Sequence, residues 1–87
     1  MSGDSAVLTE INESIEVGVI FSKGGPRPVW FLWQGRKYSV QRLTYHWKEK
    51  VGEDTLHYFS VFDGVNTFEL RYDSKLLHWK LGRVSGP

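Results

Sequence analysis

Residues 56–72 read LHYFSVFDGVNTFELRY, and this stretch decides the fold class. Two runs rich in aromatic and β-branched residues flank Asp63-Gly64, a dipeptide that strongly favours a tight β-hairpin turn. The second run alternates apolar and polar side chains from Thr67 to Tyr72, as a strand with one buried face does. The stretch therefore predicts two antiparallel strands, over residues 56–62 and about 65–72.

Strands are also predicted on both sides of this hairpin. Apolar and polar residues alternate in two of them, and a third is apolar throughout. The fourth is long and its apolar phase slips, which a β-bulge near Gln41 and Arg42 would reconcile. These four strands are expected at residues 15–22, 29–33, 36–48 and 77–81.

The sequence therefore predicts an all-β domain of about six antiparallel strands in a meander. Consecutive hairpins, the expected bulge and the small size favour a twisted sheet that forms a small barrel or half-barrel. The segment from Val7 to Ile15 is ambiguous, because Leu8, Ile11 and Ile15 fit a helical face whereas alternate residues fit a strand. A short N-terminal helical turn stays open, and an open sheet packed on a short N-terminal helix is the alternative fold.

A chain of this size has room for one hydrophobic core. Its 87 residues fall below the usual domain size of roughly 100–150. Apolar residues make up 40% and aromatic residues 15%, which is typical of a folded chain, and the absence of cysteine leaves packing alone to stabilise it. We expect a single β domain over residues 15–84, a partly flexible acidic arm over 1–14 and a flexible tail over 85–87.

Alternation along the predicted strands also separates core side chains from surface side chains. Trp30 and Trp47 are expected at the surface, where aromatic rings are available to a partner. The predicted core consists of Phe31, Trp33, Tyr38, Val40, Tyr58, Phe68, Leu70, Trp79 and Leu81.

Charge is distributed unevenly along the chain. The net charge of +1 combines −4 over the first sixteen residues, which contain no basic residue, with +5 over the rest. Residues 17–48 carry basic and aromatic residues and no acidic residue. No signal-peptide core is found and no apolar run approaches the roughly 20 residues of a membrane-spanning helix, so we expect a cytoplasmic protein with no membrane partner.

The basic block offers a candidate binding surface. Its basic side chains could neutralise phosphates, and its exposed tryptophans could stack on bases, which would make binding strongly salt-dependent. The other interpretation, which the small net charge favours, is a set of solvated charges at alternate strand positions. The candidate residues are Arg27, Trp30, Arg36, Lys37, Arg42, Trp47 and Lys48.

An ordered series of aromatic and turn residues runs through the domain: Trp33-x-Gly35-Arg36-x-Tyr38-x-Val40, then Trp47, Asp63-Gly64, Glu69-Leu70, Asp73, Trp79 and Arg83-Val84. Over roughly residues 15–84 this series resembles a small bacterial domain family of unknown function, rich in the pattern Trp-x-Gly-Arg-x-Tyr, which also occurs beside DNA-repair polymerase-like proteins. The family has no established activity, so the resemblance implies only a slight preference for nucleic acid. The turn at residues 22–25 and the Leu76-Leu77 pair depart from the pattern, and no binding residue is transferred.

No catalytic or cofactor-binding pattern is present in the sequence. His46, His57 and His78 lack the short spacing of a zinc site, and the chain contains no nucleophile elbow and no phosphate-binding glycine-rich loop before a helix. Asp63 and Asp73 lie in predicted turns, where aspartate commonly accepts hydrogen bonds from its own backbone. We therefore expect a protein that is not an enzyme and that needs no cofactor or metal.

The predicted function is that of a non-catalytic interaction module that binds a protein partner or associates with itself. Residues 15–22 are expected at a sheet edge, where an uncapped strand can pair with another chain. The alternative is a single-stranded nucleic-acid-binding module that uses the basic aromatic block. In that case the acidic residues 1–14 could fold over the basic block and compete with nucleic acid.

Overall fold

The structure, a computed structural model, describes residues 7–86. This part of the chain is all β-strand, turn and loop, so it contains no helix long and apolar enough to cross a membrane. The all-β prediction is confirmed, whereas the predictions for residues 1–6 and for Pro87 lie outside the described residues. The strands are β1 (Val7–Ser22), β2 (Gly25–Trp33), β3 (Arg36–Ser39), β4 (Arg42–Val51), β5 (Asp54–Phe62), β6 (Thr67–Asp73) and β7 (His78–Gly86).

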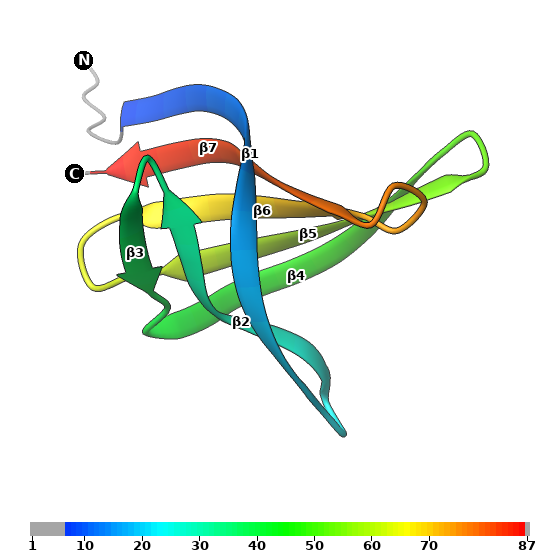
Figure 1. Ribbon diagram of the computed structural model, residues 1–87, viewed down its shortest axis with the longest axis horizontal. Helices are drawn as coiled ribbons and strands as arrows, with labels where there is room; N and C mark the ends of the chain where they lie inside the picture. The colour runs from blue at the N-terminus through cyan, green and yellow to red at the C-terminus, as the bar shows by residue number, and fades with distance from the viewer. Residues whose placement is uncertain (1–6, 87) are drawn as a thin grey trace, which may run out of the picture.

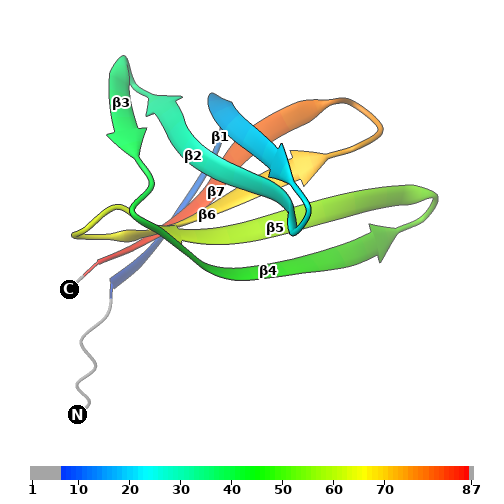
Figure 2. The same cartoon turned by 90° about the horizontal axis from the view of Figure 1, so that it is seen from below.

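All seven strands belong to one antiparallel sheet in the order β3-β2-β1-β7-β6-β5-β4. Strand β1 is long enough to serve both halves, because residues 7–15 pair with β7 and residues 16–22 pair with β2 (Figure 1). The β1–β3 half consequently lies over one face of the β4–β7 half (Figure 2). The sheet does not close, so the predicted half-barrel, and not the full barrel, describes the fold.

About six strands were expected and the structure has seven, because the expected strand over residues 36–48 is two strands. β3 and β4 lie at opposite edges of the sheet, and the chain passes between these edges at Val40 and Gln41. The Val40 amide donates to the carbonyl of Val29 in β2 at 2.9 Å, and the Gln41 amide donates to Phe62 in β5 at 2.8 Å. The slip in apolar phase therefore marks a change of edge, and the bulge of this region lies further on, between Leu43 and Tyr45.

The N-terminal boundary also differs from the expectation. Residues 7–14 form the first half of β1 instead of a separate arm or a helical turn, and residues 85 and 86 end β7. The alternation was obscured at Asn12, which has a φ of 58° and lies where the register with β7 shifts between Glu10 and Glu13. Ile11 packs against the core together with Ile15 and Val17, whereas Leu8 is 58% exposed, so Leu8 and Ile11 do not form the shared face that a helical spacing would give.

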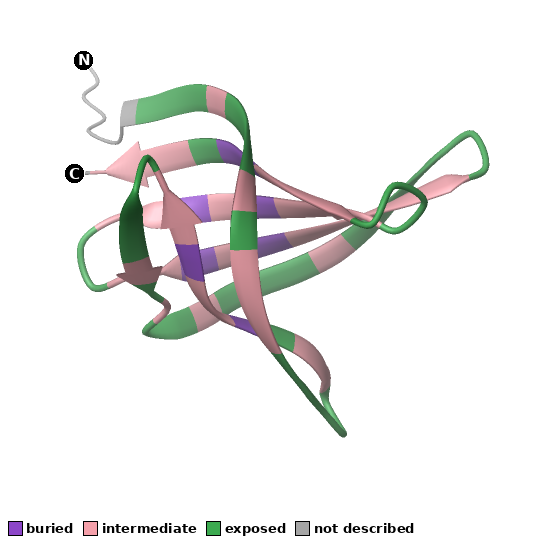
Figure 3. Ribbon diagram, in the orientation of Figure 1, coloured by how far each residue is buried: buried purple, intermediate pink, exposed green. Residues whose placement is uncertain are grey.

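The hydrophobic core lies between the two halves of the sheet, at the middle of β2, β5, β6 and β7 (Figure 3). Phe31 of β2 joins the halves, because its ring stacks on Tyr38 with centroids 5.0 Å apart and meets Phe68 edge-on at 5.0 Å. No polar or charged side chain is buried among the described residues. The fully buried hydrophobic residues are Phe31, Phe59, Val61, Phe68, Leu70 and Leu81.

Most of the predicted core is confirmed. Four of its members are fully buried, and Trp33, Tyr38, Val40 and Trp79 pack partly buried against them. Tyr58 was placed wrongly, because it lies on the outer face and its neighbours Phe59 and Val61 point inward instead. In residues 56–62, Ser60 lies on the same face as Tyr58 and His57 on the same face as Phe59. Each face therefore carries one polar residue, and the sequence does not distinguish the two faces of this strand.

The turns before and after β6 are each held by one aspartate. Asp63 accepts from the amides of Val65 and Asn66 at 2.9 and 2.7 Å. Asp73 accepts from the amides of Lys75 and Leu76 at 2.9 and 3.1 Å. The prediction that these carboxylates form turns is confirmed, and the bond from the Leu76 amide is the main cause that lowers the pKa of Asp73.

Replacing Asp73 with asparagine should flatten the acid limb of the stability curve. Because the folded-state pKa lies below its ordinary value of 3.8, ionised Asp73 contributes stability above that value, and this contribution disappears as pH falls through the folded-state pKa. The asparagine side chain keeps an acceptor oxygen but does not titrate. Urea unfolding at several pH values between about 5.5 and 2.5 should show a smaller loss for Asp73→Asn, and parallel curves would contradict the assignment.

Candidate functional site

A large cavity lies on the concave side of the half-barrel, where the sheet stays open. It measures about 500 Å³ and separates the β1–β2 hairpin from β5, β6 and β7. We call it the concave groove. Its lining residues are Val17, Val19, Phe21, Pro26, His57, Phe59, Tyr72 and Trp79.

The concave groove is chemically apolar. On one wall Trp79 contacts both Tyr72 and Phe59, with ring centroids 4.9 and 5.5 Å apart, so three aromatic rings form one surface. On the opposite wall the side chain of Phe21 is 78% exposed. An exposed aromatic side chain of this size is less favourable than a buried one by roughly 1.5–3 kcal/mol. A ligand that covered Phe21 in the groove would recover this free energy.

Basic side chains line the rim of the concave groove beside β4. The ring of His46 stacks on Phe59 with centroids 4.3 Å apart and lies 6.2 Å from His57, while Lys48 is the cross-strand partner of His57. Burial, followed by the positive charges of His57 and Lys48, lowers the pKa of His46 from its ordinary value of 6.5. Among the described residues the salt bridges involve only Arg83, so no carboxylate pairs with these rim cations.

The two edges of the sheet differ in length. β3 has four residues, whereas β4 has ten and ends the sheet on the side of the concave groove. The backbone groups of β4 that point away from β5 therefore have no strand partner within the sheet. The predicted edge at residues 15–22 is also present, because residues 16–22 pair with β2 on one side and the ladder with β7 ends at Ile15, so their other side has no strand partner among the described residues.

The convex face carries a second set of chemically active side chains. Trp47 stacks on Tyr58 with parallel rings 5.0 Å apart, and Tyr58 lies opposite Arg71. Burial and a 3.0 Å hydrogen bond to Glu49 raise the pKa of Tyr58. We call the cross-strand series on this face the convex row, and it runs through Trp47, Tyr58, Arg71, Lys80 and Ser14.

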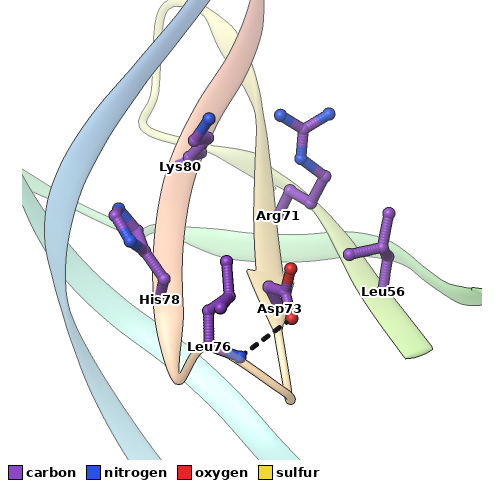
Figure 4. A pocket seen from close by; sticks show the side chains of 6 residues that line it. All are labelled: Leu56, Arg71, Asp73, Leu76, His78 and Lys80. Atoms are coloured by element: carbon purple, nitrogen blue, oxygen red, sulfur yellow. Dashed lines mark hydrogen bonds between the residues drawn. The ribbon is translucent and has the colours of Figure 1, made fainter. Parts of the chain in front are cut away.

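A shallow pocket of about 200 Å³ lies beside the convex row (Figure 4). Arg71 and Lys80 line it as direct cross-strand partners, an arrangement of like charges that is destabilising unless an anion lies nearby. Arg71 donates to Asn12 Oδ1 at 2.6 Å, and His78 shares a 2.7 Å hydrogen bond with Ser14. The only carboxylate lining the pocket, Asp73, already accepts from two backbone amides of its turn.

The structure does not bring the seven predicted binding residues together on one face. Trp30 and Lys37 form one group on the outer side of β2 and β3, with the ammonium 5.1 Å from the centre of the indole. Arg27 is exposed further along β2, where it lies opposite Ile20. Arg36 lies on the other side of β3, over the ring of Tyr38 at 5.3 Å.

The three candidates on β4 are also divided between its two faces. Arg42 lies over Phe62 at 5.0 Å, and Trp47 belongs to the convex row. Lys48 pairs with His57 at the concave groove. The basic block is therefore continuous in sequence but not in space, because alternate residues of a strand point to opposite faces.

None of the residues that line the concave groove was among the predicted binding residues. Val17, Val19 and Phe21 share one parity of β1, so the sequence does indicate that they lie on one face. It does not indicate that this face stays uncovered, because that depends on the sheet remaining open between its edge strands β3 and β4. Within residues 7–86, no group of three or more His, Cys, Asp or Glu side chains is placed to hold a metal ion.

Comparisons with protein-family models, with curated proteins and with solved structures found no match for this chain. The resemblance to the Trp-x-Gly-Arg-x-Tyr family therefore stays a prediction.

Proposed function

We propose that this chain is a non-catalytic interaction module that binds a protein partner in the concave groove. The observation that supports the proposal is an apolar cavity of about 500 Å³ whose walls include an exposed phenylalanine and three contiguous aromatic rings. Apolar surface of this kind commonly marks an interaction site. The groove contains no nucleophile, and His57 is its only ionisable side chain besides Tyr72, so binding rather than catalysis fits its chemistry.

Replacing Phe21 with serine should weaken partner binding about tenfold while the domain stays folded, because Phe21 is exposed in the groove wall. The matched control is Ile20→Ser. Ile20 is the preceding residue of β1, is 47% exposed and points to the opposite face. The ligands are peptides selected from a random display library on the immobilised protein. Each selected peptide is synthesised and titrated into the labelled protein, and the amide chemical shifts are followed.

The proposal predicts that selected peptides shift the amide signals of groove residues and lose affinity with Phe21→Ser but not with Ile20→Ser. Their binding should also persist at high salt, because apolar contacts are not screened. Equal losses for both variants, or shifts confined to the convex face, would contradict a groove-binding partner.

Single-stranded nucleic acid is the second candidate partner, and the convex row favours it. This row combines stacked aromatic rings with two adjacent cations, as base stacking and phosphate binding require. Glu49 weakens the case, because its carboxylate lies beside the aromatic pair. A mixed-sequence oligonucleotide that shifts signals of Trp47 and Arg71, and releases them as salt is raised, would make this function the better one.

Two further predictions from the sequence concern the cellular location and the family of the protein. A cytoplasmic location and membership of the bacterial Trp-x-Gly-Arg-x-Tyr family both stay proposals, and neither is needed for binding in the groove. Self-association through residues 15–22 also stays a proposal, because residues 16–22 of β1 pair with β2 alone.

A further inference from the structure

We propose that the partner is an acidic, extended segment that pairs as an additional strand with the free edge of β4 and places alternate apolar side chains in the concave groove. This inference rests on the proposed function and adds the conformation and charge of the bound segment. It requires three properties of the molecule: an accessible edge, a groove beside that edge, and a rim whose charge selects the partner.

The edge of β4 determines the conformation of the bound segment. Alternate backbone groups along β4 point away from β5, and another strand can continue the hydrogen-bonded ladder there, over the residues that follow the bulge between Leu43 and Tyr45. The opposite edge, β3, has only four residues and is much less suited to this role. Such addition would lengthen the sheet on the side where the half-barrel is open, towards the β1–β2 hairpin.

The concave groove determines the side chains of one face of that segment. His46 of β4 stacks on the groove residue Phe59, so the edge and the groove are adjacent. Alternate side chains of an added strand would project to the concave side, towards the exposed ring of Phe21. Apolar residues at every second position therefore fit the groove.

The rim determines the charge of the segment. Lys48 and Lys50 follow His46 at alternate positions of β4 and share its concave side, whereas Glu49 points to the convex face and accepts from Tyr58. Opposite charges on neighbouring strands stabilise their pairing. Aspartate or glutamate in the added strand would supply the carboxylates that these cations lack among the described residues.

The same charges disfavour a second copy of this chain at the edge. A two-fold pairing of β4 with itself centred on Lys48 places the two Lys48 side chains opposite each other and His46 opposite Lys50. A centre at Trp47 instead places His46 opposite Lys48. The centre at Lys48 brings two cations together across strands, which is destabilising, and with either centre the bulge between Leu43 and Tyr45 interrupts pairing further along.

The test uses the peptides selected on the intact chain. Each peptide is synthesised unmodified, with alternate amides N-methylated in one register, and with the other alternate amides N-methylated. Methylation removes donors along one edge of the peptide without changing its side chains. We expect selected peptides to alternate apolar with acidic residues, one methylated register to weaken binding about tenfold and the other to have little effect. Amides of β4 should become protected from hydrogen exchange.

A charge exchange tests the rim independently of the backbone. Lys48→Glu should weaken an acidic peptide about fivefold, and replacing the peptide's acidic residues with lysine should restore binding to this variant. The matched control is Lys75→Glu, which changes an exposed lysine in the β6–β7 turn and should leave affinity unchanged.

The outcomes separate this inference from the proposed function. Binding that depends on Phe21 but tolerates both methylated registers, or that ignores the charge of residue 48, would overturn strand addition and leave groove binding intact. A dimeric mass with protected β4 amides in the absence of peptide would show that the occupant is a second copy. Peptides that are insensitive to Phe21→Ser would overturn the proposed function itself.

Discussion

Replacing Phe31 with alanine is expected to lower the free energy of unfolding by about 3–5 kcal/mol. The side chain is 0% exposed and contacts Tyr38 and Phe68, so its removal leaves a cavity at the junction of the two halves of the sheet. A domain of this size has a total stability near the lower end of about 5–15 kcal/mol, so the variant should be close to unfolding at ordinary temperature. Urea unfolding followed by tryptophan fluorescence measures the loss.

The control for this prediction is Phe21→Ala. It removes the same atoms from a side chain that is 78% exposed, and we expect the stability to change by no more than about 0.5 kcal/mol. Similar losses for the two variants would mean that the halves of the sheet are not held together by the ring of Phe31.

Replacing Gly18 with alanine is expected to cost about 1–3 kcal/mol, because the new methyl group would overlap the indole of Trp30. Gly18 and Trp30 are cross-strand partners in β1 and β2, and the indole lies directly over the glycine. The alanine can be accommodated only if the indole leaves this position. The matched control is Gly24→Ala, which meets no atom within 4 Å and should have little effect.

A double-mutant cycle identifies the indole as the cause. Once Trp30 is replaced with alanine, the further change Gly18→Ala should cost much less than it does in the natural chain, so the two effects should not add. Additive losses would place the origin of the destabilisation in the backbone of β1.

The fold class could be read from the sequence because the strands alternate and because Asp63-Gly64 and Gln34-Gly35 indicate turns. Both central residues of the second turn have positive φ, 53° at Gln34 and 73° at Gly35, as a type I′ hairpin requires. The edges of the sheet could not be read in this way. Local patterns do not reveal that residues 7–15 of β1 pair with β7, which joins the two halves into one sheet and leaves β4 at its far edge.

The candidate site was predictable in composition but not in position. Exposed aromatic and basic residues were expected, and Trp47 and Lys48 do lie at the two surfaces described above. They are neighbours in sequence on opposite faces of β4, so one supports the convex row and the other the rim of the concave groove. To assign each residue to its surface, one must know which side chains of β4 point to the concave face. The bulge after Leu43 changes this alternation, so the sequence pattern does not give it.

The pairing of β1 with β7 has a consequence for the speed of folding. Val7 and Gly86 are cross-strand partners, so the loop closed by this contact includes nearly all the described residues. The hairpins within β1–β3 and within β4–β7 can each form on a timescale of about 1–10 μs, whereas joining them requires loop closure at large sequence separation. Docking of the two meanders should therefore limit the folding rate, with the β4–β7 face exposed until β1 reaches β7.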